Sequence, residues 1–355
     1  MSATKTPDTQ GVRFSESVTS TLNSTADNSY KSPWPMRRHT PFAKTPQSRR
    51  IKVGQKSGRL TRTPPNESQI SDWKQLINKT WHTYCVTPMY QFSYETDQMK
   101  KYSQHLSAQL KSEANKGTGV SCDESFADRA VFRVLKGLAI GADDSEAVDI
   151  TVTSKKAGIS KTIFSAMLIS VEAQVGDQMQ IANHNFTNLP LLLVKGPVAI
   201  SRTVVDFLQT GFDCVINPLQ FCPMELAWMV TVWTGFTEDG SKKPTELFYK
   251  VPDEVKGLQR ITLTIEADDA KALWDSVHEE GSNEVTGEEV AAFIKSLERH
   301  FYRHFKVHLD AMTITRIGTG VAYVGQEGRL KILSENQVIQ VLAYLTDLAL
   351  TNTIV

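Results

Sequence analysis

The stretch ADDAKALWDSVHEEGSNEVTGEEVAAFIKSLERHFYRHFKVHL, residues 267–309, carries the clearest local structural signals in the chain. Asp268 or Asp269 can cap a short first helix. After a loop, Thr286 and Glu289 form a T-x-x-E pattern, in which each side chain accepts a hydrogen bond from a free backbone N–H. The apolar residues that follow are spaced by three or four positions, as on one face of a helix: Val290, Phe293, Ile294, Leu297 and Phe301. The sequence predicts a long amphipathic helix packed on a core.

The last turns of this predicted helix are basic and aromatic. Arg299, Arg303 and Lys306 lie at spacings of four and three, so we expect them to share an exposed flank. We expect Phe301 and Phe305 to hold the other side in the core. Cations here suit the negative end of the helix dipole, but the same side chains could also face a phosphate backbone. Both interpretations stay open at the level of sequence.

Three histidines in this region, His300, His304 and His308, recur every four residues and raise the alternative of a zinc site. Phe301 occupies the position of the metalloprotease glutamate, and Arg303 adds repelling charge to the same face. No Asp, Glu or Cys nearby completes a ligand set, and zinc needs four converging ligands. We therefore predict a structural helix end and no metal.

Other candidate motifs are incomplete. GTGVAYVG, residues 318–325, lacks the third glycine of a dinucleotide-binding turn, and GFTEDGSKK, residues 235–243, lacks the lysine of a phosphate loop. There is no G-x-S-x-G nucleophile elbow. The sequence thus predicts neither a catalytic residue nor a cofactor nor a small-molecule substrate.

Composition is that of a globular protein, with 40% hydrophobic and 22% charged residues. The apolar runs are shorter than the roughly 20 residues of a membrane span, so no membrane segment is expected. The four cysteines show no disulfide-type spacing, which predicts reduced, buried thiols. These are Cys85, Cys122, Cys214 and Cys222.

The net charge is zero, but the charges are unevenly distributed between an N-terminal tail, residues 1–66, and the body that follows. Residues 1–66 hold 12 Lys or Arg and 3 Asp or Glu, so this segment carries +9 and the remainder −9. The segment is poor in aliphatic residues and rich in Ser, Thr and Pro, which predicts a disordered tail. Ser32, Thr40 and Thr45 each precede a proline and are candidate phosphorylation sites. Any DNA-binding surface of the acidic body must be local.

Beyond the tail, strand and helix patterns come in blocks, which predicts an α+β fold with a mostly antiparallel sheet. Helices are expected over residues 70–81, 99–110, 198–208, 223–233 and 338–348, besides the two described above. Strands are expected over residues 89–95, 130–135, 148–153, 163–171, 189–194, 212–216, 246–251, 260–266, 307–317, 320–324 and 330–333. Lys155, Lys156 and Lys161 then fall in a loop-like stretch and form a rival basic cluster.

Several segments resemble the centromere protein L family, in the same order and over most of the chain after residue 66. They are WHTYCVTPMYQFSY (81–94), NLPLLLVKG (188–196), FDCVINPL (212–219), ELAWMVTVWT (225–234), ALWDSVH (272–278), RHFYRHFKVHL (299–309) and VLAYLTDLAL (341–350). The resemblance implies two α/β halves with curved sheets flanked by helices. With a boundary near residues 235–243, the halves span residues 67–240 and 241–355.

The resemblance also implies a function. By this resemblance, the chain would be a non-enzymatic subunit of the inner kinetochore in the nucleus. It would support chromosome segregation in mitosis. The family pairs with centromere protein N through its C-terminal half, contacts centromere protein C and other subunits, and helps form a basic groove around the linker DNA of the centromeric nucleosome. The alternative is a metal- or nucleotide-binding enzyme without a recognisable motif.

Two sets of site residues follow as expectations. Residues 312–333 have short strands and alternating side chains, which suit the addition of a partner's strand to a sheet edge, so Ile314 and Val321 are candidate interface residues. For DNA, the basic helix end is favoured over the lysine cluster, because side chains on a rigid element lose less entropy on binding.

Overall fold

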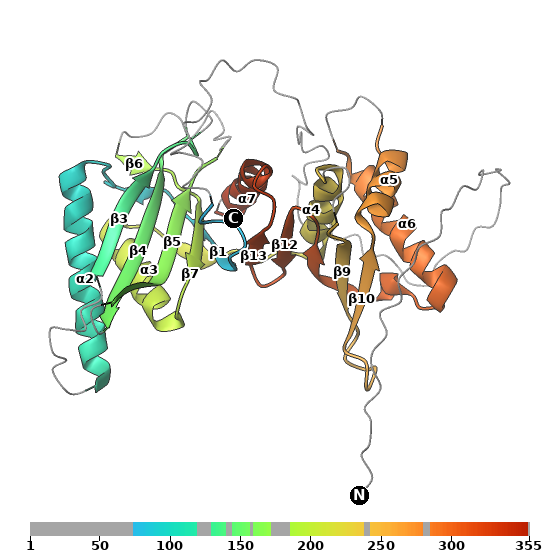
Figure 1. Ribbon diagram of the computed structural model, residues 1–355, viewed down its shortest axis with the longest axis horizontal. Coiled ribbons are helices and arrows are strands. Elements are labelled where there is room, and N and C mark those ends of the chain that lie inside the picture. The colour runs from blue at the N-terminus through green and yellow to red at the C-terminus, as the bar shows by residue number, and fades with distance from the viewer. Residues whose placement is uncertain are drawn as a thin grey trace, which may run out of the picture.

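The computed structural model describes residues 74–118, 129–139, 144–156, 159–171, 185–237, 242–279 and 285–353. The predicted tail of residues 1–66, including Ser32, Thr40 and Thr45, lies outside these residues, as does Cys122. In the described part, helices flank one long antiparallel sheet (Figure 1), which confirms the α+β prediction. No helix in these ranges has both the length and the hydropathy needed to cross a bilayer.

The main sheet has 11 strands and runs through both halves of the molecule, in the order β10-β9-β11-β12-β13-β1-β7-β5-β4-β3, with β8 paired to β1. The N-terminal strands are β1 (Trp81–Val86), β3 (Arg129–Leu135), β4 (Ala147–Lys156), β5 (Ile159–Ile169), β7 (Leu191–Lys195) and β8 (Ile216–Pro218). The C-terminal strands are β9 (Thr245–Lys250), β10 (Arg260–Ile265), β11 (Thr313–Gly318), β12 (Ala322–Gly325) and β13 (Arg329–Ile332). The register Trp81↔Leu330 joins the halves, because it pairs the first strand with the last.

In the N-terminal half, α2 (Thr96–Thr118) and α3 (Val198–Phe212) cover one face of β3, β4, β5 and β7. Both helices carry apolar side chains at helical spacing, as the sequence predicts. They bury a core that includes Phe132, Phe164 and Phe207. A separate ribbon of β2 (Met89–Tyr90) and β6 (Phe186–Thr187) lies beside this sheet.

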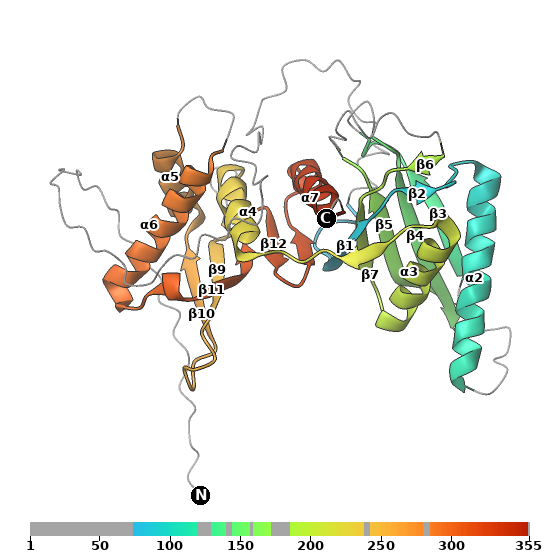
Figure 2. The ribbon, with the colours of Figure 1, turned by 180° about the vertical axis from the view of Figure 1, so that it is seen from behind.

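In the C-terminal half, α4 (Pro223–Gly235), α5 (Ala267–Val277) and α6 (Gly287–Phe305) bury the opposite face of the sheet. The last helix, α7 (Val338–Thr353), lies between the two halves and packs on β1 and β7 (Figures 1 and 2). The helix α4 packs against β11, α5 and α6, which all lie beyond residue 240. We therefore favour a boundary between the halves just before Pro223.

Several predicted elements are wrong or displaced. Residues 74–81 contain no helix: Ile77 bridges to Ile332, and Trp81 begins β1, a strand that pairs with β13 and β7. Residues 91–95 are not a strand. The helix α3 continues through Phe212, so the strand predicted at 212–216 begins only at Ile216. A 3-10 turn, η2 (Leu309–Ala311), precedes β11 where one long strand was expected.

Candidate nucleic-acid interface

The helices α4–α7 cover only one face of the C-terminal strands. Inward-pointing residues such as Leu247, Ile317 and Val324 are buried under these helices. On the opposite face polar and basic residues alternate with them and stay exposed, as Arg260 and Thr262 do on β10. The strands of this half therefore present a polar outer surface, which an antiparallel sheet allows.

This outer surface contains a depression with a volume of about 470 Å³. Five cationic side chains and one carboxylate line it: Lys250, Arg260, Arg316, Arg329, Lys331 and Glu327. The cations come from β9, β10, β11 and β13, so they converge from strands far apart in the sequence. A concave surface on which cationic side chains predominate concentrates positive potential and attracts anions.

Two of the five cations have carboxylate partners. The ammonium group of Lys250 lies 3.2 Å from an Asp253 carboxylate oxygen, and Nε of Arg329 lies 3.6 Å from Glu327. Within the described residues, Arg260, Arg316 and Lys331 have no carboxylate within 4 Å. These three cations are free to bind an external anion.

Aromatic rings form part of the same surface. The guanidinium groups of Arg260 and Arg316 lie 5.8 Å and 5.4 Å from the centre of the Phe248 ring. The ring of Tyr323 covers Gly318 on the neighbouring strand, where a Cβ would come within 2.2 Å of the ring. Burial and the nearby Glu246 carboxylate raise the pKa of Tyr323, so its hydroxyl stays neutral at physiological pH. The site is thus a basic surface with aromatic and hydroxyl groups.

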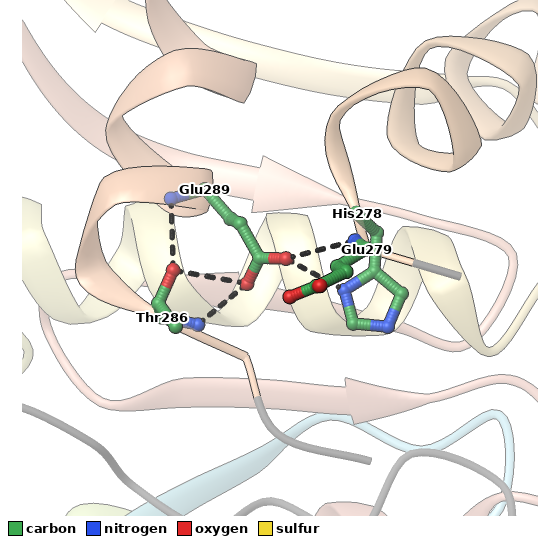
Figure 3. Close-up of polar contacts among 4 residues, drawn as sticks. All are labelled: His278, Glu279, Thr286 and Glu289. Carbon is green, nitrogen blue, oxygen red and sulfur yellow. Dashed lines mark hydrogen bonds and ion pairs between the residues drawn. The ribbon is translucent and has the colours of Figure 1, made fainter. Parts of the chain in front are cut away.

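The predicted basic helix end is formed, and its start is well anchored. The carboxylate of Glu289 accepts hydrogen bonds from the backbone N–H groups of Thr286 and Glu279, at 2.6 Å and 3.1 Å. It also contacts Nδ1 of His278 at 3.0 Å, which links the start of α6 to the end of α5 (Figure 3). The capping box is confirmed. By contrast, Glu266 is the N-cap of α5 and makes no side-chain cap, so Asp268 and Asp269 lie in its first turn.

At the other end of α6, Arg299, Arg303 and Lys306 are all exposed, as predicted. Lys306 ends the helix in the left-handed conformation, and its ammonium group lies 5.6 Å from the ring centre of Tyr302. Phe301 is buried, but Phe305 is 46% exposed, so the expectation that both rings enter the core is wrong. Phe305 is the last residue of the helix, and its ring lies 4.6 Å from that of Phe301.

The three histidines do not form a metal site in the described chain, where no group of three His, Cys, Asp or Glu side chains has metal-binding geometry. The rings of His300 and His304 lie 4.7 Å apart, while His308 lies beyond the helix end against Tyr302. Burial, followed by the charges of His304 and Arg303, lowers the pKa of His300. The imidazole of His300 is therefore neutral at pH 7 and adds no charge to this helix end.

The rival lysine cluster lies on a hairpin, which corrects the prediction of a loop. Strand β4 extends through Lys156 and β5 begins at Ile159, with Lys161 paired to Ser154. Lys155 and Lys161 are exposed. Because β7 and β1 separate this hairpin from β13, the nearest strand of the basic depression, the two clusters belong to different halves of the sheet.

The interface candidates lie in the interior. Ile314 is 6% exposed and Val321 is 1% exposed, and both belong to the hydrophobic core. Strands β11, β12 and β13 each have two neighbours, so the expected sheet edge at residues 312–333 is wrong. The outermost strands of the sheet are β10 and β3.

These two outer strands differ in how their edges are covered. The backbone N–H groups of Ala130 and Phe132 on β3 donate to the hydroxyls of Ser107 and Ser103 on α2, at 2.9 Å and 3.0 Å. Two N–H groups of this edge therefore have acceptors on a helix. Strand β10 pairs only with β9, and no other described strand occupies its second edge.

The sequence analysis did not predict the depression, although the sequence does show which strand residues lie on a polar face. The alternation in residues 260–265 and 329–332 places Arg260, Arg329 and Lys331 on the polar faces of strands. What was missing was the order of the strands, which brings them onto one surface. The cysteine prediction also needs correction, because Cys85 and Cys214 are buried but Cys222 is exposed.

Comparison with known proteins assigns the chain to a family. The centromere protein L family model matches residues 75–350. Centromere protein L of Homo sapiens is 35% identical over 323 residues, which cover 86% of this chain and 92% of the relative. The Xenopus tropicalis protein is 34% identical and covers 89% of each chain, and the Danio rerio protein is 29% identical over 78% of this chain and 76% of the relative. This chain therefore belongs to the centromere protein L family.

Proposed function

We propose that this protein is a non-enzymatic subunit of the inner kinetochore, acting in the nucleus at the centromere during chromosome segregation in mitosis. In this proposal it pairs with centromere protein N, associates with centromere protein C and other subunits, and contacts the DNA of centromeric chromatin. Membership of the centromere protein L family supports the centromeric role. The DNA contact rests on one observation, the basic depression on the helix-free face of the sheet.

The depression suits a phosphate backbone better than the two clusters expected from sequence. Three of its cations have no carboxylate partner among the described residues, and they come from three different strands of a rigid sheet. Arg299, Arg303 and Lys306 instead lie at the end of one helix, where unpaired carbonyl groups add partial negative charge. The lysines of the β4–β5 hairpin lie near its tip. The helix and hairpin clusters stay as alternative DNA contacts.

Three triple-alanine variants, each of which removes three positive charges, can distinguish between these sites. The first changes Arg260, Arg316 and Lys331. The second changes Arg299, Arg303 and Lys306, and the third changes Lys155, Lys156 and Lys161. The measurement is the affinity of each full-length variant, with and without centromere protein N, for two unrelated DNA duplexes over a range of salt concentrations.

We expect the first variant to weaken binding about equally on both sequences, because phosphate contacts carry no sequence information. Its slope of log affinity against log salt should fall by up to ~3, since three phosphate contacts are lost. An unchanged slope in this variant, with a reduced slope in either of the others, would move the DNA site to that cluster. Unchanged slopes in all three would contradict a DNA contact through these residues.

The open edge of β10 supports pairing with centromere protein N by strand addition. An edge strand presents unpaired N–H and C=O groups that a second chain can complete. The other outer strand donates two N–H groups to α2, so among the described residues β10 is the edge without a covering element. This strand replaces residues 312–333 as the proposed contact, because Ile314 and Val321 have almost no accessible surface.

Hydrogen–deuterium exchange tests this pairing directly, since it reports whether backbone N–H groups gain a partner. Exchange over residues 260–265 should slow when centromere protein N is added, while exchange over residues 129–135 should stay the same. Equal exchange in residues 260–265 with and without the partner would exclude β10 as the pairing edge. Metal content and turnover assays on the same preparation address the alternative of an enzyme, which predicts bound metal or activity.

A further inference from the structure

The most specific arrangement in the basic depression is a pair of arginines on one aromatic ring. Phe248 lies on β9, between β10 and β11. Arg316 lies opposite it on β11, and Arg260 lies diagonally across on β10. Their guanidinium groups are 5.4 Å and 5.8 Å from its ring centre. A cation within about 6 Å of a ring centre is attracted to the ring's negative face.

A β-bulge in β11 aims Arg316 at this ring. The register shifts between Ile314 and Arg316, so that Thr315 is an extra residue in the strand. Without the extra residue, strict alternation would turn Arg316 toward the core and Ile317 toward solvent. With it, Arg316 is exposed and Ile317 is buried.

Hydrogen bonds hold the bulge in place. The hydroxyl of Thr315 donates to the carbonyl of Phe248 at 3.2 Å, so the bulge is attached to the strand that carries the ring. The N–H of Gln326, in the turn after β12, donates to the carbonyl of Thr315 at 2.8 Å. The ring and the backbone that aims Arg316 therefore form one unit.

We propose that Phe248, with the bulge at Thr315, is a positioning device that holds Arg260 and Arg316 ready for a nucleic-acid phosphate backbone. This inference rests on the proposed DNA contact of the same surface. An exposed arginine loses rotamer freedom when it binds an anion, and a ring that already restrains it reduces that loss. Phe248 itself makes no phosphate contact; it acts through the two guanidinium groups.

The test is a double-mutant cycle on the full-length chain, with a labelled DNA duplex as the probe. Phe248→Leu keeps an apolar side chain but removes the ring face, and Phe248→Tyr keeps the ring. Each is combined with the double change Arg260→Ala and Arg316→Ala. Phe186→Leu is the matched control, because Phe186 is an exposed aromatic residue of β6 that contacts Tyr90. Urea unfolding checks that each variant is folded.

We expect Phe248→Leu to weaken DNA binding about two- to fivefold, the size of an exposed cation–aromatic interaction. The salt dependence should not change, because the number of phosphate contacts is the same. Phe248→Tyr should bind like wild type. In the background without the two arginines, Phe248→Leu should have no further effect, since a positioning residue needs the groups it positions.

Three results would overturn the inference. Wild-type affinity of Phe248→Leu, while the arginine variant is weakened, would remove the positioning role and leave the DNA contact in place. An equal loss from Phe248→Leu in both backgrounds would show that the ring contacts DNA itself or supports the fold. Wild-type affinity of the arginine variant would refute this DNA contact, and the positioning role with it.

Discussion

At the scale of single residues, the side chain of Glu289 links the start of α6 to the end of α5. Its carboxylate caps α6 at Thr286 and reaches the end of α5 at Glu279 and His278 (Figure 3). Burial alone would raise the pKa of this carboxyl group. The hydrogen bonds from the backbones of Thr286 and Glu279 and from the side chains of Thr286 and His278 outweigh burial and lower it. A carboxylate with a lowered pKa stabilises the folded state only while it is ionised.

Glu289→Gln should therefore destabilise the protein by about 0.5–2 kcal/mol at pH 7, the usual range for the loss of a helix cap. Wild-type stability should fall as the pH drops below about 4.5, because protonation removes the favoured charge. The variant should lose part of that pH dependence. Urea unfolding from pH 7 to pH 4 measures both effects. Glu288→Gln is the control, since Glu288 lies in the same first turn and is exposed; equal curves for both variants would contradict the assigned role.

The described cysteines should react at different rates. Burial raises the pKa of Cys214 to about 11, and Cys85 is also buried, so neither readily forms an accessible thiolate. Cys222 is exposed at the start of α4. Alkylation of the native protein at pH 8, followed by peptide mapping, should label Cys222 well before the other two. Labelling of all three at one rate would show that the N-terminal core opens readily.

At the scale of elements, the contact between α2 and β3 closes one edge of the sheet. The hydroxyls of Ser103 and Ser107 donate to their own helix, to the carbonyls of Met99 and Ser103. The same oxygens accept from the N–H groups of β3. Each serine hydroxyl therefore takes the place of a carbonyl acceptor that a neighbouring strand would provide.

The double change Ser103→Ala and Ser107→Ala should cost about 1–3 kcal/mol, because two partly buried N–H groups lose their acceptors. It should also promote self-association through the uncovered edge. Urea unfolding and sedimentation velocity measure the two effects. Ser201→Ala on α3 is the control, since within the described residues that hydroxyl bonds only to the carbonyl of Pro197. A double variant as stable and monomeric as the control would show that the serines do not protect the edge.

At the scale of the whole molecule, the prediction for the tail rests on composition. Removing residues 1–66 takes away a net charge of +9. The melting temperature of the body should stay nearly unchanged, because a segment that cannot bury enough apolar surface contributes no core. Thermal unfolding of the full and truncated chains tests this. A large fall in the melting temperature would mean that the tail packs on the body.

The same tail carries the predicted regulatory sites. Phosphorylation of Thr40 or Thr45 would add negative charge to a basic segment and weaken its attraction to anions. Replacing both residues with alanine in the full chain should change mitotic localisation without changing thermal stability. Localisation identical to wild type would argue that these sites have no regulatory role.

The sequence by itself determined what depends on neighbours along the chain. The capping box of α6, its buried stripe, the basic helix end and the α+β class all follow from spacings of a few residues. Such spacings set which backbone groups and side chains meet within one element. The helix predicted over residues 70–81 is wrong for the same reason: its apolar spacing fits a helix, but Trp81 begins β1, and β1 pairs with the two distant strands β13 and β7.

Only the tertiary structure decided where the candidate sites lie. Lys250 and Lys331 are 81 positions apart in the sequence, yet they line one depression because β11 and β12 bring their strands into one sheet. The bulge at Thr315 turns Arg316 outward, and no local pattern predicts that shift in register. The order of the strands also placed Ile314 in the interior and left β10 at the edge. Pairing between distant strands is set by the packing of the whole core, which short-range spacing does not contain.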